Sequence, residues 1–196
     1  MKINLEIIDA AFLYDKEQVD NLNTKVLVPK MVLRRRLTRA SKLVVELISK
    51  TGFENGRIIY GSGFGELLAT SNILKAILND SGVSPTDFQN SVYNTAVSYA
   101  SILSSNKNEI LTISSGDETS LKVLKVGAVK ALDKDEIFLV VTETLNIENI
   151  DEVNSCENFL ECAVALRVQV TNKEANLFYE GCSLDINAPK SVSHML

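Results

Sequence analysis

The stretch that decides the fold is Thr112-Ile113-Ser114-Ser115-Gly116-Asp117-Glu118-Thr119-Ser120. Its first residues have the pattern of a buried strand, and a helical pattern of apolar residues begins just after the glycine. A strand that turns sharply into a helix presents the side chain at the turn beside the positive end of the helix dipole. That geometry suits a nucleophile, yet the residue at this turn is an acid.

Strands and helices alternate along the chain on both sides of this stretch. Strands are predicted at residues 3–8, 57–60, 109–115 and 137–141, and helices at residues 33–47, 66–79, 92–104 and 118–132. The composition of residues 9–28 predicts an irregular excursion. The acid-rich segment 143–161 is predicted to be an exposed loop. Residues 163–170 and 176–186 alternate apolar and polar positions, which predicts an antiparallel hairpin. The sequence therefore predicts an α/β fold with a mixed, mostly parallel sheet, helices on both faces and a C-terminal antiparallel hairpin.

Length and composition favour a single globular domain spanning residues 1–196. The net charge of −5 argues against nucleic acid or membrane as a partner of the whole surface. We find neither a signal peptide nor a membrane-spanning run, and expect a cytoplasmic location. The three cysteines, Cys156, Cys162 and Cys182, lack a metal-site spacing, so we expect small apolar side chains, no metal and no cofactor.

Three further segments accompany the central stretch in a fixed order. They are Lys30-Met31-Val32-Leu33-Arg34-Arg35-Arg36-Leu37, Ile59-Tyr60-Gly61-Ser62-Gly63-Phe64-Gly65-Glu66, and Ser84-Pro85-Thr86-Asp87-Phe88-Gln89-Asn90-Ser91-Val92-Tyr93-Asn94. Together, over residues 29–170, the four segments resemble the amino-terminal half of a β-ketoacyl synthase, in the divergent branch without the catalytic half. The resemblance implies one half of a thiolase-like fold.

The resemblance places the family's nucleophilic cysteine on Asp117, or on Glu118 if the alignment shifts by one residue. A condensing cysteine acts as a thiolate, whose pKa is lowered by the helix that it begins. A carboxylate would be a poor acyl carrier, because its acyl derivative is a mixed anhydride that hydrolyses readily. We therefore expect Asp117 to be a helix cap at a site that no longer catalyses.

The histidines point the same way. The family's two catalytic histidines belong to the missing half, and the one histidine of this chain, His194, is expected to be a frayed terminal residue. An acyl hydrolase or transferase that used Ser114, Ser115 or Ser120 would need that histidine, so this alternative is the weakest. The glycines at 61–65 have the wrong spacing for a nucleotide-binding turn and are expected to be structural.

The resemblance implies a non-catalytic subunit, like a chain-length factor, in fatty acid, polyketide or aryl-polyene biosynthesis. Its expected partner is a complete ketosynthase, and the alternative is a homodimer that binds an acyl chain or an acyl carrier protein. Tyr93, Asn94 and Thr95 are expected at the acyl pocket or the dimer seam. The lysines at 122, 125 and 130 suggest that the helix after Asp117 is partly open to solvent, with apolar surface left for a partner.

A basic cluster stands out in this acidic chain. Arg34, Arg35, Arg36, Arg39 and Lys42 follow Lys30, and helical spacing would place Arg35, Arg39 and Lys42 on one side of a helix. A solvated helix face is one interpretation. The other is a docking site for an acidic partner, which by resemblance would be the acyl carrier protein.

Overall fold

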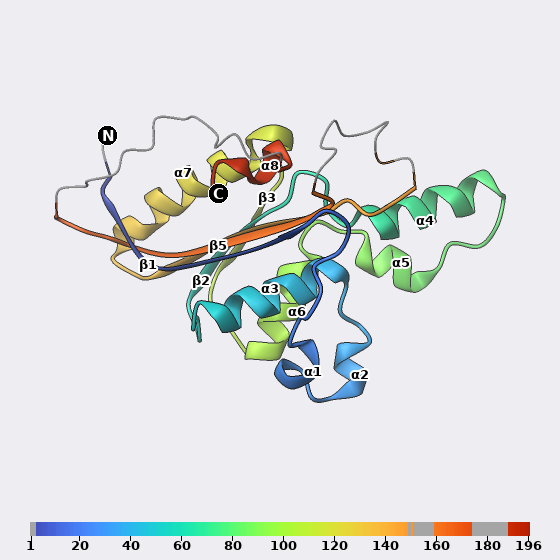
Figure 1. Ribbon diagram of the computed structural model, residues 1–196, viewed down its shortest axis with the longest axis horizontal. Coiled ribbons are helices and arrows are strands. Elements are labelled where there is room, and N and C mark those ends of the chain that lie inside the picture. The colour runs from blue at the N-terminus through green and yellow to red at the C-terminus, as the bar shows by residue number, and fades with distance from the viewer. Residues whose placement is uncertain (1–2, 149, 151–158, 174–187) are drawn as a thin grey trace.

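The computed structural model describes residues 3–148, 150, 159–173 and 188–196 (Figure 1). The strands are β1 Leu5–Asp15, β2 Arg57–Gly61, β3 Ile110–Ile113, β4 Ile137–Thr144 and β5 Glu161–Val170. The helices are α1 Thr24–Leu27, α2 Met31–Arg34, α3 Arg39–Lys50, α4 Leu67–Leu78, α5 Pro85–Asn90, α6 Thr95–Ser104, α7 Thr119–Lys130 and α8 Lys190–Ser193, with short 3₁₀ turns η1 Gly116–Glu118 and η2 Ala131–Asp133. In the described part of the chain, no helix has the length and apolar character needed to cross a bilayer.

The strands form one mixed sheet in the order β1-β5-β4-β2-β3. The neighbours β4, β2 and β3 run parallel, and their crossovers carry the helices. The strands β1 and β5 are antiparallel to their neighbours and complete the sheet at its other edge. The predicted fold class is confirmed, although the second arm of the predicted hairpin, 176–186, lies outside the described residues; the partners of β5 are β1 and β4.

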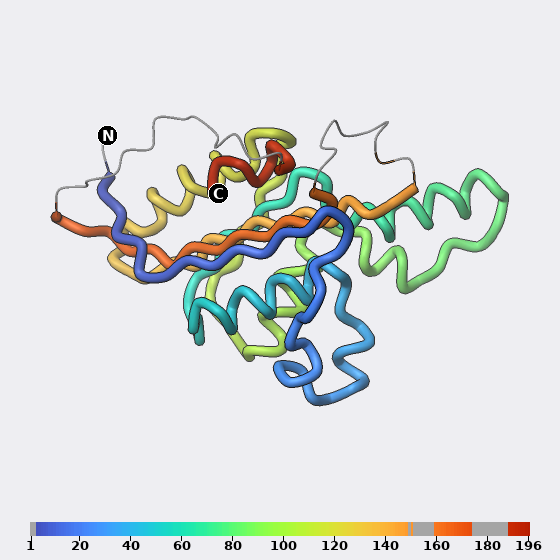
Figure 2. Tube along the Cα trace, viewed as in Figure 1, coloured from blue at the N-terminus to red at the C-terminus, as the bar shows by residue number. Residues whose placement is uncertain are grey.

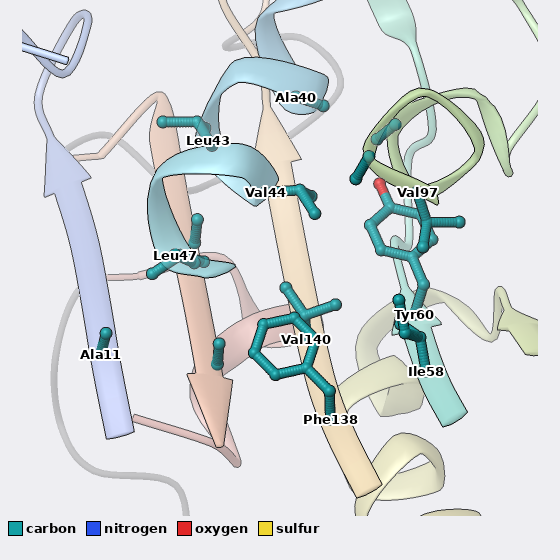
Figure 3. Close-up of a cluster of buried hydrophobic side chains, with 14 of the residues drawn as sticks. Ala11, Ala40, Leu43, Val44, Leu47, Ile58, Tyr60, Val97, Phe138 and Val140 are labelled. Carbon is teal, nitrogen blue, oxygen red and sulfur yellow. The ribbon is translucent and has the colours of Figure 1, made fainter. Parts of the chain in front are cut away.

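Helices cover both faces of the sheet, α3 and α6 on one and α7 and α8 on the other (Figure 1). On the first face, leucines and valines of α3 pack over Phe138 and Val140 of β4, and Tyr60 of β2 lies beside Val97 (Figure 3). On the second face, Val123 of α7 packs with Ile59 and Leu139. The apolar run of β4 is continuous because both faces of this central strand are buried.

Strand β1 is longer than predicted because a bulge at Ile8 interrupts its alternation. Leu5 pairs with Val170 and packs on the face of α7 and α8, whereas Ala11 pairs with Ala165 and packs on the face of α3 and α6. One extra residue therefore moves the odd-numbered side chains from one face to the other. The predicted excursion of residues 9–28 is wrong up to Asp15, since that part belongs to the strand.

The predicted helix 33–47 is two helices. Helix α2 ends at Arg34, and α3 begins after Thr38, whose hydroxyl accepts a hydrogen bond from the Ser41 amide at 3.1 Å. Arg35 and Arg36 thus lie between the helices and do not share a helix face with Arg39. The helix predicted at 92–104 begins at Thr95, and the short helix α5 precedes it.

Both ends of the predicted acidic loop are buried in strands. Glu143 ends the buried part of β4, and Glu161 begins β5 at 1% exposure. Glu161 accepts two hydrogen bonds from the Arg39 guanidinium, at 2.6 Å each, and a third from the Val19 amide at 2.8 Å. Arg39 also donates to the Val19 carbonyl, so one ion pair holds α3, β5 and the chain after β1 together.

We predict that Arg39→Ala lowers the free energy of unfolding by about 3–5 kcal/mol, because it leaves the Glu161 carboxylate buried and unpaired. Urea denaturation measures the change. The double variant Arg39→Ala with Glu161→Gln should recover part of the loss, and an equal or larger loss in the double variant would contradict this account.

We also predict that Gly127→Ala destabilises the protein by about 1–3 kcal/mol through overpacking. A Cβ at Gly127 would lie 2.4 Å from Cδ2 of Leu139, in the contact between α7 and β4. Gly82→Ala is the matched control, since a Cβ at Gly82 meets no atom within 4 Å. A thermal melt that shows equal effects of the two substitutions would contradict the close packing of α7.

Candidate functional site

The turn between β3 and α7 has the strand-to-helix geometry that the sequence predicts. We call residues 114–118 the elbow; Gly116 has φ +54°, in the left-handed region that glycine tolerates best. The Thr119 hydroxyl donates to the Gly116 carbonyl at 2.7 Å and accepts from the Ser115 amide at 3.0 Å. Thr119, and not an acid, therefore satisfies the polar backbone groups of the elbow.

The two acids of the elbow lie at the surface. Asp117, with its side chain 67% exposed, has its carboxylate 3.8 Å from Nζ of Lys190, and Glu118 lies 3.3 Å from Nζ of Lys122. Neither side chain makes a capping hydrogen bond to η1 or α7, so the predicted capping role of Asp117 is wrong. Its carboxylate does occupy the turn before the helix, where the family's cysteine was predicted to stand.

A third acid, Glu143, was not predicted and is fully buried beneath the elbow. Residues 61–65, which we call the glycine turn, wrap around its carboxyl group. It accepts hydrogen bonds from the Ser62 hydroxyl at 3.0 Å and from the amides of Gly63 at 2.5 Å and Phe64 at 3.3 Å. Glu143 follows the apolar run of β4 at the carboxyl ends of the parallel strands, and that position is the signal that could have identified it.

Burial raises the pKa of Glu143 to about 7, against the opposing effect of the Ser191 hydroxyl and the hydrogen bonds of the glycine turn. Ser191 lies beside the carboxyl group without a hydrogen bond of good geometry. Burial also raises the pKa of Glu66 to about 7, against a hydrogen bond of 2.6 Å from the Thr38 hydroxyl. Near-neutral carboxyl groups are typical of proton-transfer sites, but Glu143 has no solvent-accessible face.

Three of the four segments that carry the resemblance meet at the glycine turn. A Cβ at Gly63 would lie 3.0 Å from the Gly116 carbonyl oxygen of the elbow and 2.8 Å from Cβ of Ser191 in α8. A Cβ at Gly65 would lie 3.1 Å from the Tyr93 ring. Glu66, next to the turn, accepts a hydrogen bond from the hydroxyl of Thr38, which directly follows the fourth, Arg-rich segment. The glycines therefore allow close packing, as predicted.

The other predicted site residues are divided between surface and interior. Tyr93 and Asn94 are exposed in the turn before α6, whereas Thr95 is buried and donates to the Asn90 carbonyl at 3.2 Å. In the basic cluster, the Arg39 side chain is held by Glu161, and Arg34 donates to the Val28 carbonyl at 3.0 Å. Arg35 and Arg36 are exposed, and Lys42 is half-buried.

His194 is ordered against the first turn of α7, contrary to the expectation of a frayed residue. Its Nδ1 lies 3.1 Å from Oγ of Ser120, and its backbone amide donates to the same oxygen at 3.2 Å. This Ser–His pair has no access for a substrate, because Ser120 is fully buried. Ser115 accepts instead from Nζ of Lys122 at 2.6 Å.

Helix α8 covers the elbow from the side of α7 (Figure 1). Ser191, Val192 and Ser193 of this helix are buried against the second core cluster and the glycine turn. No cluster of histidine, cysteine or carboxylate side chains in the described ranges has the arrangement of a metal site. A separate groove of about 440 Å³ lies between α4 and residues 146–148. Nζ of Lys75 and a carboxylate oxygen of Glu148, both at this groove, lie 2.7 Å apart.

The family profile described as "Beta-ketoacyl synthase, N-terminal domain" matches residues 11–194 of the chain. The chain belongs to this family. The match covers the elbow, the glycine turn and α8, so the contacts among these three elements lie within the family's domain. A comparison with curated protein sequences found no match.

Three solved structures share the thiolase-like ketosynthase fold. A chain of the ketosynthase (ApeO) in complex with its chain length factor (ApeC) from Xenorhabdus doucetiae is 20% identical with a TM-score of 0.74; the match covers 98% of this chain and 91% of that one. The ishigamide ketosynthase/chain length factor is 11% identical with a TM-score of 0.62, covering 81% and 50%. A β-ketoacyl synthase from Burkholderia phymatum STM815 is 13% identical with a TM-score of 0.55, covering 72% and 44%. This chain spans about half the length of the last two.

We predict that Glu66→Gln removes a loss of stability that the wild type undergoes as the pH rises. The folded pKa of about 7 lies above the unfolded value of 4.5, so the folded state binds the proton more tightly. The contribution of Glu66 to the free energy of unfolding is fully present below pH 4.5 and is lost as the pH rises through 7. A shift of one pKa unit corresponds to about 1.4 kcal/mol. The free energy of unfolding of Glu66→Gln, relative to that of the wild type, should therefore rise by roughly 3 kcal/mol between pH 4 and pH 8.

Urea denaturation across this pH range measures the effect. Glu118→Gln removes an exposed carboxyl group and serves as the control, which should keep the wild-type profile. Parallel pH profiles for Glu66→Gln and the wild type would contradict the assignment.

Proposed function

We propose that the chain is a non-catalytic ketosynthase-like subunit, comparable to a chain length factor, that pairs with a complete ketosynthase. The observation that carries the proposal is the elbow, which has the strand-to-helix geometry of a nucleophile site and a carboxylate at its turn. A carboxylate cannot hold an acyl chain as a thioester, so a partner would have to supply the bond-forming chemistry. Fatty acid, polyketide and aryl-polyene assembly are the pathways that we consider.

The similarity to ketosynthase/chain length factor complexes supports this pairing. The chain has about the length of the chain that it matches in the first complex and about half that of the chain in the second. Its proposed role is to complete the partner's dimer seam and to bound the acyl tunnel, in the cytoplasm. Tyr93 and Asn94 are the exposed residues beside the glycine turn that we assign to this seam.

The largest group of exposed apolar side chains lies on an arm formed by α4 and α5. The arm projects from the sheet (Figure 2). Helix α4 buries only Ala69, and α5 buries no residue. The exposed large apolar side chains of the arm are Leu68, Leu74, Ile77, Leu78, Val83 and Phe88. The arm, residues 67–90, contains three charged residues among 24, Lys75, Asp80 and Asp87, which is a smaller share than the 23% of the whole chain. A low content of charged residues is typical of the core of a protein interface.

The exposed apolar surface of α7, a candidate partner interface, is smaller than the sequence suggested. Val129 and Leu132 are exposed, whereas Val123 is buried against the sheet. Strand β3 adds to the candidate interface, because it is the last strand of the sheet and β2 is its one partner among the described strands. The arm and β3 therefore support a protein partner more strongly than α7 does.

The second candidate is a homodimer that binds an acyl chain or carrier protein alone. The same arm would serve it, since an apolar surface does not distinguish a second copy from a ketosynthase. Affinity purification of the tagged chain from its native cell separates the two. Recovery of a full-length ketosynthase supports our proposal, and recovery of the chain alone supports the homodimer. A serine acyl hydrolase is disfavoured by the burial of Ser120.

We predict that the chain associates through the arm at micromolar concentration, with a co-expressed ketosynthase or with itself. Ile77→Ser together with Phe88→Ser should shift the complex to monomer in size-exclusion chromatography with light scattering, because it removes two of the arm's exposed anchors. Ile7→Ser, at the β1 edge, is the matched control and should leave the complex intact. A wild-type chain that stays monomeric both alone and with the ketosynthase would contradict the pairing.

A further inference from the structure

The basic charge of the chain is concentrated in one segment. Residues 24–42 contain seven of the 20 basic residues and none of the 25 acidic ones. The rest of the chain therefore carries 13 basic and 25 acidic residues, a net charge of −12. A molecule polarised in this way turns its basic end toward a negatively charged surface.

This segment includes a lobe, formed by α1 and α2, that projects from the sheet on the side of α3 (Figures 1 and 2). Lys25, Lys30, Arg35 and Arg36 are exposed on the lobe. No carboxylate of the described residues lies within ion-pair distance of these four, in contrast to Arg39. Their charge is therefore available to a ligand.

Aliphatic side chains are exposed between these cations. Val26 is 75% exposed, Met31 51% and Val32 67%, whereas Val28, two residues after Val26, is buried. Cations beside exposed aliphatic side chains suit the boundary of a membrane, where the charges meet lipid phosphates and the aliphatic groups enter the apolar layer. A partner helix is usually received by an apolar groove, whereas these aliphatic side chains are exposed on a projecting lobe.

We propose that the α1–α2 lobe docks the protein onto an anionic phospholipid surface. The cations at 25, 30, 35 and 36 bind the headgroup phosphates, and Val26, Met31 and Val32 enter the boundary of the acyl layer. The net charge of −5 disfavours binding through the whole surface, as the sequence predicts, but the lobe alone is basic. The acyl carrier protein, predicted as the partner of the basic cluster that includes Arg35 and Arg36, is the rival occupant. This docking does not depend on pairing with a ketosynthase.

Co-sedimentation of the full chain with vesicles tests the proposal. Vesicles of 70% phosphatidylcholine and 30% phosphatidylglycerol should bind the chain at low salt, and pure phosphatidylcholine vesicles at least tenfold more weakly. Binding should fall as sodium chloride rises, because salt screens the charges. No binding to the anionic vesicles at low salt would overturn the proposal.

Two variants separate the charges from the aliphatic groups. The first variant should lower the affinity for anionic vesicles at least tenfold. It combines Lys25→Gln, Lys30→Gln, Arg35→Gln and Arg36→Gln. The matched control changes the net charge by the same amount at four exposed lysines elsewhere, and it should bind like the wild type. Its substitutions are Lys16→Gln, Lys50→Gln, Lys107→Gln and Lys125→Gln. Val26→Ser with Val32→Ser should lower the affinity at least threefold, with thermal melts confirming that each variant is folded.

Equal losses in the lysine control and the lobe variant would overturn the proposal, since general charge would then explain binding. An unchanged affinity of Val26→Ser with Val32→Ser would overturn the insertion of the aliphatic groups. Binding of a purified holo acyl carrier protein of a fatty acid synthase, with the same dependence on the lobe and without vesicle binding, would assign the lobe to the rival.

Discussion

The carboxyl group of Glu143 inside the glycine turn is the contact on which the site depends. It joins the end of β4 to the turn after β2 through the amides of Gly63 and Phe64 and the hydroxyl of Ser62. A carboxyl group so deeply buried is stable only where donors surround it, and the turn supplies them. Because Gly63 has no side chain, the elbow and α8 can close over the same point.

This packing accounts for a domain that keeps the family's architecture. The turn before α7 presents Asp117 at the surface, while Ser191 and Val192 fill the space behind it. The apolar arm of α4 and α5 and the open edge of β3 then become the surfaces that remain for a partner. In this account the interior preserves the shape of a ketosynthase half, and the exposed elements carry the proposed function.

Local patterns predict the elements whose environment is uniform along the chain. The run at 137–141 and the helical pattern after Glu118 are correct because both faces of β4 and one face of α7 are buried throughout. The bulge at Ile8 and the cap at Thr38 escape such patterns. The bulge changes the register within one strand, and the cap begins a second helix where the pattern predicts one. The buried acids at 143 and 161 also escape, because their donors and counter-charge come from residues 80 and 122 positions away.

The loss of acyl chemistry at the elbow is the central claim, and intact-mass spectrometry tests it most directly. The purified chain is incubated with acyl thioesters of coenzyme A, from acetyl to long-chain, and its mass is measured over time together with free thiol release. We predict an unchanged mass and no thiol release above the uncatalysed rate. A stoichiometric acyl adduct on Asp117, Ser115 or Ser120, or turnover of the thioester, would contradict the claim.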